Sequence, residues 1–263
     1  MEKKLAWSEK RILESDDVDL FRQLRPTRLT KYLQEIAWNH ARAIGVGYDN
    51  EKFKDIHWVL VRLEIDINGP LPLWGDTMHI HTQAAGIETV FALREFILEV
   101  ETSEGPREFC RATSSWVIID GKSRRIQKPK PFIEDLLVPE NPRALDTTAQ
   151  KISFDSSKEW SKSPVLRAGY NDIDVHDHVN NGKYLEWFLS DLGREFFEEK
   201  EVSKIELNFL SEVGWGDSLE RQFLFPDEDS TWHRICRIGS ENKPVSPSAI
   251  GRIVWKSRAL HLD

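Results

Sequence analysis

The stretch RLTKYLQEIAWNHARAIG, residues 28–45, carries an unbroken helical stripe of residues that favour burial. The stripe comprises Leu29, Tyr32, Leu33, Ile36, Ala37, His40, Ala41 and Ile44. Intervals of three and four residues predict an amphipathic helix with one face against a core, and Gly45 is expected to end it. A single histidine on such a face is more often structural than catalytic, so we expect His40 to be a core residue.

A second stretch, GKYLEWFLSDLGREFF at residues 182–197, shows a similar stripe with one charged interruption and predicts a second long helix. The stripe comprises Tyr184, Trp187, Phe188, Leu192, Glu195 and Phe196. Alternating or β-rich segments predict strands at 58–67, 76–82, 90–101, 109–120, 203–210, 218–225, 232–240 and 248–257. In the segment 76–82, His79 and His81 flank Ile80 and are expected on the outer face of the strand.

Short matches indicate that the two halves repeat one another. KYLQE at residue 31 resembles KYLEW at residue 183, and WGDT at residue 74 resembles WGDS at residue 215. The sequence of each half predicts a long helix followed by antiparallel strands, which is an α+β architecture. Residues 131–165 are rich in Pro, Ser, Asp and Lys, so we expect them to link a domain at 1–130 to a domain at 166–263.

Composition and charge exclude several classes of protein. The formal net charge of −8 argues against non-specific nucleic-acid binding, but it allows a local basic patch. The two cysteines, Cys110 and Cys236, are too far apart in sequence to suggest a zinc ribbon or a disulfide framework. We find no signal-peptide pattern, no apolar run long enough for a membrane span and no G-x-G-x-x-G motif. A cytoplasmic protein without a membrane segment or a nucleotide cofactor is therefore expected.

The segment NDIDVHDHVNN, residues 171–181, concentrates aspartate, histidine and asparagine. If it is extended, the polar residues Asp172, Asp174, His176, His178 and Asn180 share one face. Three interpretations arise: a metal site, a capped turn before the second helix, or a catalytic cluster. An H-x-H pair beside aspartates suits zinc or iron, but no third strong ligand stands at a recognised spacing, so we expect no metal.

The same segment resembles a known family. DIDVHDHVNNGKYLEW (172–187) is similar to the D-x-D-x-N-x-H-V-N-N-x-K-Y signature of fatty acyl-[acyl carrier protein] thioesterases of plants and bacteria. In the first half, LTKYLQEIAWNHARAIG (29–45), WVLVRLEIDINGPLPLWGDTMHIHTQAAG (58–86), REFILEV (94–100) and ATSSWVIIDGKSRRIQKP (112–129) also resemble the family. The likeness extends in order over most of residues 8–257.

This resemblance implies two hotdog domains in tandem, each with an antiparallel β-sheet wrapped around a long central helix. It also implies hydrolysis of the thioester between a fatty acyl chain and the phosphopantetheine arm of acyl carrier protein (ACP). In the family the N-terminal domain holds the acyl chain, so the apolar stripe of the first helix and the strands facing it are the expected lining. The resemblance is compatible with a monomer or a homodimer.

The family's functional positions transfer to four residues. The second Asp of the signature falls on Asp174, its Asn on His176 and its His on His178. Downstream, LNFLSEVGWGD (207–217) places the family's Glu at Glu212 and the Cys of some members at Val213. His176 and Val213 therefore depart from the pattern. Because position 213 has no thiol, the resemblance implies direct attack by water rather than a cysteine nucleophile.

Within this scheme Glu212 is the leading candidate for the base that activates water. His178 is the alternative base, or polarises the water or the carbonyl, and Asp174 is expected to orient a neighbouring imidazole. The ring N–H of His176 is expected to donate to the thioester carbonyl where the family has an amide. Asn180 and Asn181 are expected to cap the following helix, and Tyr184 to pack on its core side.

A cluster of basic residues in GKSRRIQKPK, residues 121–130, is the candidate docking patch for the acidic ACP. It comprises Lys122, Arg124, Arg125, Lys128 and Lys130. The simpler interpretation is an ordinary solvated turn. Two other functions remain open at this point, namely a hotdog acyl-CoA thioesterase and a non-catalytic acyl-binding protein. Retention of Asp174, His178 and Glu212 together favours an enzyme.

Overall fold

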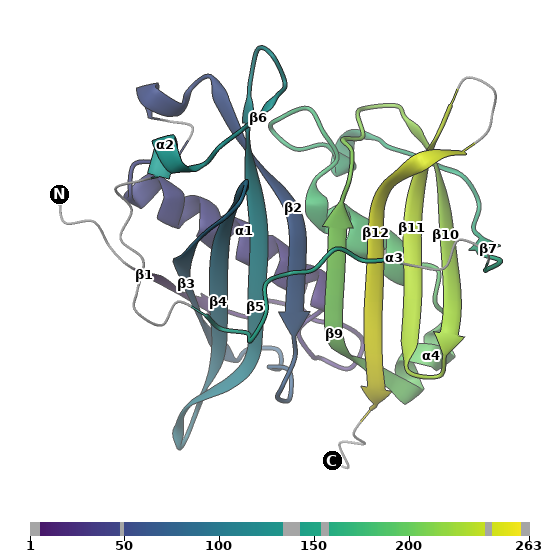
Figure 1. Cartoon of the computed structure of the whole chain (residues 1–263). Coiled ribbons are helices and arrows are strands. Elements are labelled where there is room, and N and C mark those ends of the chain that lie inside the picture. Colours follow the sequence, from purple (N-terminus) through teal and green to yellow (C-terminus); the bar gives the residue numbers. More distant parts are fainter. Residues whose placement is uncertain (1–5, 48–49, 134–142, 154–157, 240–243, 259–263) are drawn as a thin grey trace. The chain divides into compact units, whose positions relative to one another are not determined.

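The computed structural model of the chain describes residues 6–47, 50–133, 143–153, 158–239 and 244–258 (Figure 1). The chain divides into two compact units, unit 1 (Met1–Gln150) and unit 2 (Lys151–Asp263). The division falls inside the segment 131–165 that composition predicts as a linker, part of which lies outside the described residues. Each unit combines antiparallel strands with helices, as the sequence predicts.

Unit 1 contains an antiparallel sheet in the order β1-β3-β4-β5-β2, with β6 paired to β5. The strands are β1 (Ala6–Ile12), β2 (Ile56–Asp66), β3 (Thr77–Glu88), β4 (Phe91–Thr102), β5 (Gly105–Asp120) and β6 (Ile126–Gln127). The sequence did not predict β1, because its residues alternate only between half-buried and exposed positions. His79 and His81 lie on the outer face of β3 as predicted, where they pair with Glu101 and Glu99.

Helix α1 (Pro26–Ala43) lies against the sheet of unit 1 and contacts β1 and β3 (Figure 1). Pro26 begins it, where a missing N–H is harmless, and Gly45 follows it with a φ of 76°, which favours glycine. Its buried residues are Leu29, Thr30, Leu33, Ile36, Ala37 and His40. The predicted stripe and the structural place of His40 are thus confirmed. Two short elements, η1 (Glu51–Phe53) and α2 (Lys130–Ile133), complete unit 1.

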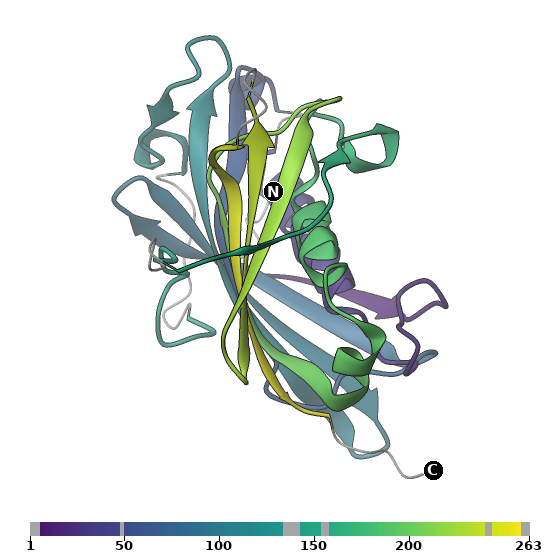
Figure 2. The same cartoon turned by 90° about the vertical axis from the view of Figure 1, so that its right-hand side faces the viewer.

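Unit 2 has antiparallel strands in the order β9-β12-β11-β10-β7, with β8 also paired to β10. They are β7 (Ser161–Lys162), β8 (Leu166–Arg167), β9 (Lys200–Phe209), β10 (Ser218–Asp227), β11 (Ser230–Ile238) and β12 (Pro244–Ser257). Helix α3 (Asn181–Leu189) contacts β10, β11 and β12 on one side of these strands (Figure 2). A helical turn, η2 (Tyr170–Asp172), lies between β8 and α3. None of the described helices combines the length and the apolar character needed to cross a bilayer.

The second predicted helix, residues 182–197, is wrong in its length. The structure has α3 and a separate α4 (Arg194–Glu199), with Gly193 in an extended conformation before the latter. At the end of α3, Ser190 Oγ donates to the Trp187 carbonyl at 2.8 Å and accepts from Arg221 Nη1 at 2.6 Å. Arg221 also pairs with the buried Asp191 at 2.8 Å. The ion pair of Asp191 with Arg221 and the following Gly193 lie at the point where the predicted helix is interrupted.

The two Trp-Gly-Asp matches form equivalent turns. In unit 1, Asp76 Oδ2 accepts from Leu73 N at 2.8 Å, and Gly75 has a φ of 87°. In unit 2, Asp217 Oδ2 accepts from Gly214 N at 3.0 Å, and Gly216 has a φ of 83°. The positive φ favours glycine, and the aspartate closes each turn directly before β3 or β10. This repeated turn supports the duplication that the sequence predicts.

The core of unit 2 is filled where α3 meets the strands. Phe188 and His233 stack with their rings 5.1 Å apart, and both are buried. A Cβ added at Gly251 would lie 2.5 Å from Phe188 Cε2, so only glycine lets the ring lie against β12. His233 Nε2 lies 2.9 Å from Thr231 Oγ1, and its Nδ1 has no partner among the described residues. Burial without a charged partner lowers the pKa of His233 to about 3.

This histidine makes the stability of unit 2 depend on pH. Between a folded pKa of about 3 and the ordinary value of 6.5, the unfolded state binds more protons than the folded state. The free energy of unfolding should therefore fall as the pH drops from 6.5 towards 3, by up to ~1.4 kcal/mol per pH unit from this group. Urea unfolding at several pH values should show a shallower fall in His233→Phe, which keeps the stacked ring. Parallel curves for the two proteins would contradict this assignment.

Candidate active site

Residues 173–179 form a tight turn before α3 rather than the extended segment considered from the sequence. Ile173 and Val179 form an isolated bridge, and Asp174 N donates to the His178 carbonyl at 2.8 Å. Asp177 has a φ of 63°, a left-handed conformation that aspartate adopts more readily than most residues. The turn breaks the alternation, so the five polar residues 172–180 do not line one face.

Asp174 holds this turn closed. Its Oδ1 accepts from His176 N at 2.9 Å, which is an Asx turn. The sequence-based expectation that Asp174 orients an imidazole is not met, because among the described residues its carboxylate bonds only to the backbone of His176. The carboxylate instead sets the backbone that carries His176 and His178. The side chain of His176 is exposed.

His178 and Glu212 come together as the resemblance implies. His178 Nε2 lies 3.3 Å from Glu212 Oε2, and the two side chains are 35% and 40% exposed. Two backbone contacts set this distance: His178 bridges to Gly214, and Val179 N donates to the Val213 carbonyl at 2.8 Å. The loop after β9 thus presents a carboxylate to the turn before α3, and water can reach both groups.

The first residues of α3 directly follow the turn that carries His178. Asn180 is the N-cap, with its side chain accepting from Gly182 N at 2.9 Å, which confirms its predicted role. Tyr184 is buried, also as predicted. Burial and the negative charges of Asp217, Glu212 and Asp174 raise the pKa of Tyr184, so its hydroxyl stays protonated at neutral pH. These three carboxylates therefore act on one buried phenol at the base of the site.

Thiol chemistry is not available at this site. Both cysteines are buried, Cys110 in β5 of unit 1 and Cys236 in β11 of unit 2. Burial is the largest cause that raises the pKa of each thiol, so neither forms a reactive thiolate at neutral pH. Position 213 is a fully buried valine. In the described part of the chain, no group of three or more His, Cys, Asp or Glu side chains could hold a metal ion.

Unit 1 contains a second copy of the turn 173–179, which the sequence matches did not reveal. Asp19 N donates to the Gln23 carbonyl at 2.8 Å, and Asp19 Oδ1 accepts from Phe21 N at 2.9 Å. Arg22 has a φ of 63°, the same value as Asp177. Leu24 N donates to the Pro72 carbonyl at 2.8 Å, as Val179 N does to Val213.

The copies differ at the chemically important positions. In unit 1 Gln23 occupies the place of His178, and Leu71, which precedes Pro72, occupies the place of Glu212. By the same correspondence, Pro26 at the start of α1 is the counterpart of Asn181 at the start of α3. The two KYL matches are therefore out of structural register by three residues. The turn of unit 2 therefore carries a histidine that pairs with a glutamate, whereas its copy in unit 1 has Gln23 and Leu71 at these places.

The five basic residues of 121–130 are all exposed, around β6 and the start of α2. Asp120 organises the turn, since its Oδ1 accepts from both Ser123 N and Ser123 Oγ at 2.7 Å. Lys122 Nζ lies 4.0 Å from Asp55, a loose and exposed pair. The structure thus gathers the predicted patch on one surface turn of unit 1.

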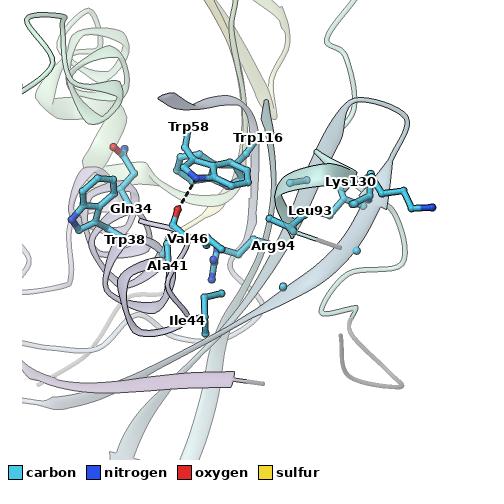
Figure 3. A pocket seen from close by; sticks show the side chains of 16 residues that line it. Gln34, Trp38, Ala41, Ile44, Val46, Trp58, Leu93, Arg94, Trp116 and Lys130 are labelled. Atoms are coloured by element: carbon cyan, nitrogen blue, oxygen red, sulfur yellow. Dashed lines mark hydrogen bonds between the residues drawn. The ribbon is translucent and has the colours of Figure 1, made fainter. Parts of the chain in front are cut away.

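Unit 1 also has a partly open apolar cavity of about 350 Å³ between α1 and the sheet (Figure 3). Its lining includes Ala37, Trp38, Ala41 and Ile44 of the α1 region, Trp58 of β2, Ala84 of β3, Leu93 of β4 and Trp116 of β5, together with the polar side chains of Gln34, Arg94 and Lys130. Trp58 Nε1 donates to the Val46 carbonyl at 3.0 Å, which fixes one wall. The sequence indicated the stripe of α1 as lining, but not the polar groups.

Two family profiles match the chain in order. The profile described as the acyl-ACP thioesterase N-terminal domain matches residues 4–136, and that described as the acyl-ACP thioesterase C-terminal domain matches residues 155–244. The first alone covers about half of the 263 residues.

Individual proteins agree with these profiles. The chain is 30% identical over 200 residues to the chloroplastic palmitoyl-acyl carrier protein thioesterase of Cuphea hookeriana, covering 72% of this chain and 47% of that protein. It spans about half the length of the first curated relatives that it matches. In fold it is similar to an acyl-ACP thioesterase from Bacteroides thetaiotaomicron (TM-score 0.82, 22% identity, 95% of this chain and 98% of that one). The 12:0-ACP thioesterase from Umbellularia californica gives a TM-score of 0.80 at 22% identity, over 97% and 98% of the two chains.

Proposed function

The chain belongs to the acyl-ACP thioesterase family, and on that premise we propose that it hydrolyses the thioester between a fatty acyl chain and ACP, releasing the fatty acid. The observation that carries this proposal is the pair of His178 and Glu212, 3.3 Å apart and open to water. A thioester carbonyl is electrophilic and its thiolate is a good leaving group, so a base, an activated water and a carbonyl donor suffice.

In the proposed mechanism Glu212 orients a water molecule and removes its proton as the oxygen attacks the thioester carbon. His178, within reach of Glu212, polarises the water or the carbonyl and returns a proton to the departing sulfur. The C–S bond breaks as the carbonyl re-forms, which yields the fatty acid and the free thiol of the phosphopantetheine. The exposed imidazole of His176 donates to the carbonyl oxygen. Asp174 acts through the turn that it closes.

Asp174→Ala should lower kcat/KM for an acyl-ACP by at least about tenfold, because the turn that aligns His178 with Glu212 loses its side-chain bond. Asp19→Ala is the matched control, since it removes the same bond from the copy of the turn in unit 1. The rates of both variants should be measured together with their melting temperatures. Equal rate losses in the two variants would show that general destabilisation, rather than alignment, is being measured.

The proposal includes the finer fold of each unit. We assign both units as hotdog domains, in which an antiparallel sheet curves around a central helix, α1 in unit 1 and α3 in unit 2. The support is the repeated order of elements, with a closed turn, a helix and antiparallel strands in each unit.

We assign the cavity of unit 1 to the acyl chain. Its wall is built mainly from aliphatic and aromatic side chains of α1 and of β2–β5. Each methylene transferred from water into such a wall contributes ~0.8 kcal/mol, so an acyl chain can provide most of the binding energy. In unit 2 the core beside α3 is filled by Phe188, which stacks on His233.

We assign the basic turn 121–130 to ACP docking. Lys130, at its end, also lines the cavity, so the proposed docking surface and the proposed acyl site share a residue. An acidic carrier would be attracted by exposed Lys and Arg side chains on a chain that is otherwise acidic.

Reversing the charge of Arg124 and Arg125 to glutamate should raise KM for an acyl-ACP by about tenfold at low salt, because long-range attraction is replaced by repulsion. Kinetics with acyl-ACP and with a small acyl-pantetheine thioester should separate the two effects, since only the first substrate carries the acidic protein. The difference from wild type should fade as salt rises. An equal change for both substrates would contradict docking at this turn.

The decisive experiment for the function is a panel of acyl-ACP thioesters of different chain lengths, assayed for released fatty acid. The same chains carried by coenzyme A test the alternative of an acyl-CoA thioesterase, through the ratio of the two kcat/KM values. Hydrolysis of the ACP series at the higher kcat/KM supports the proposal. Binding of acyl chains without hydrolysis of any member would replace it with a non-catalytic acyl-binding role.

A further inference from the structure

The cavity of unit 1 contains two polar groups that an unsubstituted acyl chain cannot satisfy. Gln34 of α1 lines the cavity, and its Nε2 is buried without a hydrogen-bond partner among the described residues. Arg94 of β4 lines it as well and extends towards α1 (Figure 3). Burying an amide N–H or a guanidinium against apolar surface is unfavourable unless an acceptor meets it.

The contacts of Arg94 leave its charge without compensation. Its Nη1 lies 2.8 Å from His40 Nδ1 and donates to Thr82 Oγ1 at 3.2 Å. Because a guanidinium only donates, the ring nitrogen of His40 is the acceptor, and both partners are uncharged groups. In the described part of the chain, no carboxylate forms an ion pair with Arg94. Burial lowers the pKa of Arg94 to about 10, which still leaves it a cation at neutral pH.

The apolar side chains that line the cavity around Gln34 and Arg94 offer these two donors no acceptor. Ala37, Ala41, Leu93 and Trp116 line the same cavity and offer no acceptor from their side chains. An acceptor that enters the cavity on the ligand would therefore find these donors beside apolar side chains, where hydrogen bonds to a charged group are strong. An unsubstituted chain would cover Gln34 and Arg94 without offering either of them an acceptor.

We propose that this cavity selects acyl chains bearing an oxygen acceptor, a hydroxyl, oxo or carboxylate group, which Gln34 and Arg94 bind. The proposal rests on the function above, because it names the class of acyl group that the thioesterase accepts. Gln34 and Arg94 are then specificity-determining residues of unit 1, distant in sequence from the acid–base pair.

The test uses acyl-pantetheine amides, in which an amide replaces the thioester so that binding is measured without turnover. One series is unsubstituted, and the others have the same chain length with a hydroxyl at successive carbons, or a terminal carboxylate. By calorimetry the wild-type protein should bind at least one oxygenated amide roughly 10- to 100-fold more tightly than the unsubstituted amide. The hydroxyl and carboxylate series show which acceptor is preferred.

Two variants assign the preference to the proposed residues. Arg94→Met should bring the ratio of the two dissociation constants close to one and should strengthen binding of the unsubstituted amide. Gln34→Leu should reduce the ratio of dissociation constants partly. If Arg94→Met does not fold, the ratio measured for Gln34→Leu decides the question. Arg62→Met is the matched control, because Arg62 stacks 4.8 Å from the Phe91 ring centroid and does not line the cavity. Its ratio should equal that of the wild type.

Two results would overturn the inference: the wild type binding unsubstituted amides as tightly as every oxygenated one, or the ratio persisting in both cavity variants. The fate of the proposed function is separate. A preference for oxygenated amides without hydrolysis of any acyl-ACP would sustain the cavity assignment and remove the thioesterase proposal. Hydrolysis of acyl-ACP without a preference for oxygenated amides would sustain the thioesterase proposal and remove the cavity assignment.

Discussion

Replacing His178 with alanine, or Glu212 with glutamine, should lower kcat for an acyl-ACP by about 10²- to 10⁴-fold while the protein stays folded. Each substitution removes one member of the 3.3 Å pair that is proposed to activate water. Glu212→Gln keeps the size of the side chain and removes only its ability to take a proton. The effect should therefore appear in kcat, with a much smaller change in KM.

The chain offers a matched control for this experiment. His79 and Glu101 form another histidine–glutamate pair at 2.7 Å, on the outer face of unit 1. His79→Ala and Glu101→Gln remove the same chemical groups from a place that no proposed step uses, so kcat should stay within about twofold of wild type. Wild-type turnover by both His178→Ala and Glu212→Gln would exclude this pair as the catalytic centre.

The largest effect on stability is expected from Phe188→Ala, which should lower the free energy of unfolding by about 4 kcal/mol. The ring is buried between the stacked His233 and the backbone of Gly251, so truncation leaves a cavity. Urea unfolding followed by tryptophan fluorescence would measure the loss. Phe225→Ala, at a site that is 48% exposed, should be much less destabilising. Similar losses in both variants would contradict the tight packing described for Phe188.

The long strands β2–β5 and β9–β12 and the first helix could be predicted from the sequence because each depends on a local period. The stripe in 28–45 extends over four turns and ends at a glycine, so α1 forms as expected. The stripe in 182–197 was misleading, because α3 ends at Leu189, beside an ion pair of Asp191 with Arg221, which is 30 positions further on. Such a contact leaves no period in the sequence.

The candidate site was predictable only in part. His178 and Glu212 came from the resemblance, and the structure places them together. The role of Asp174 depends on a backbone turn with a left-handed residue at Asp177, which alternation of polar residues cannot indicate. The copy of that turn in unit 1 was hidden, because its geometry is kept by main-chain bonds while Phe21 and Gln23 replace the two histidines. The polar groups of the cavity, Gln34 of α1 and Arg94 of β4, could not be predicted because they come from elements far apart in the sequence.

The two copies of the turn have a consequence for how this protein can be altered. In a symmetric assembly of identical subunits, every substitution appears twice, so a change that suits the substrate tail also enters the reacting centre. Here one chain holds both copies, with Gln23 in one and His178 in the other. If unit 1 binds the acyl chain and unit 2 cleaves the thioester, as we propose, mutations in the lining of unit 1 can be selected for a new acyl group independently of those that tune bond cleavage in unit 2.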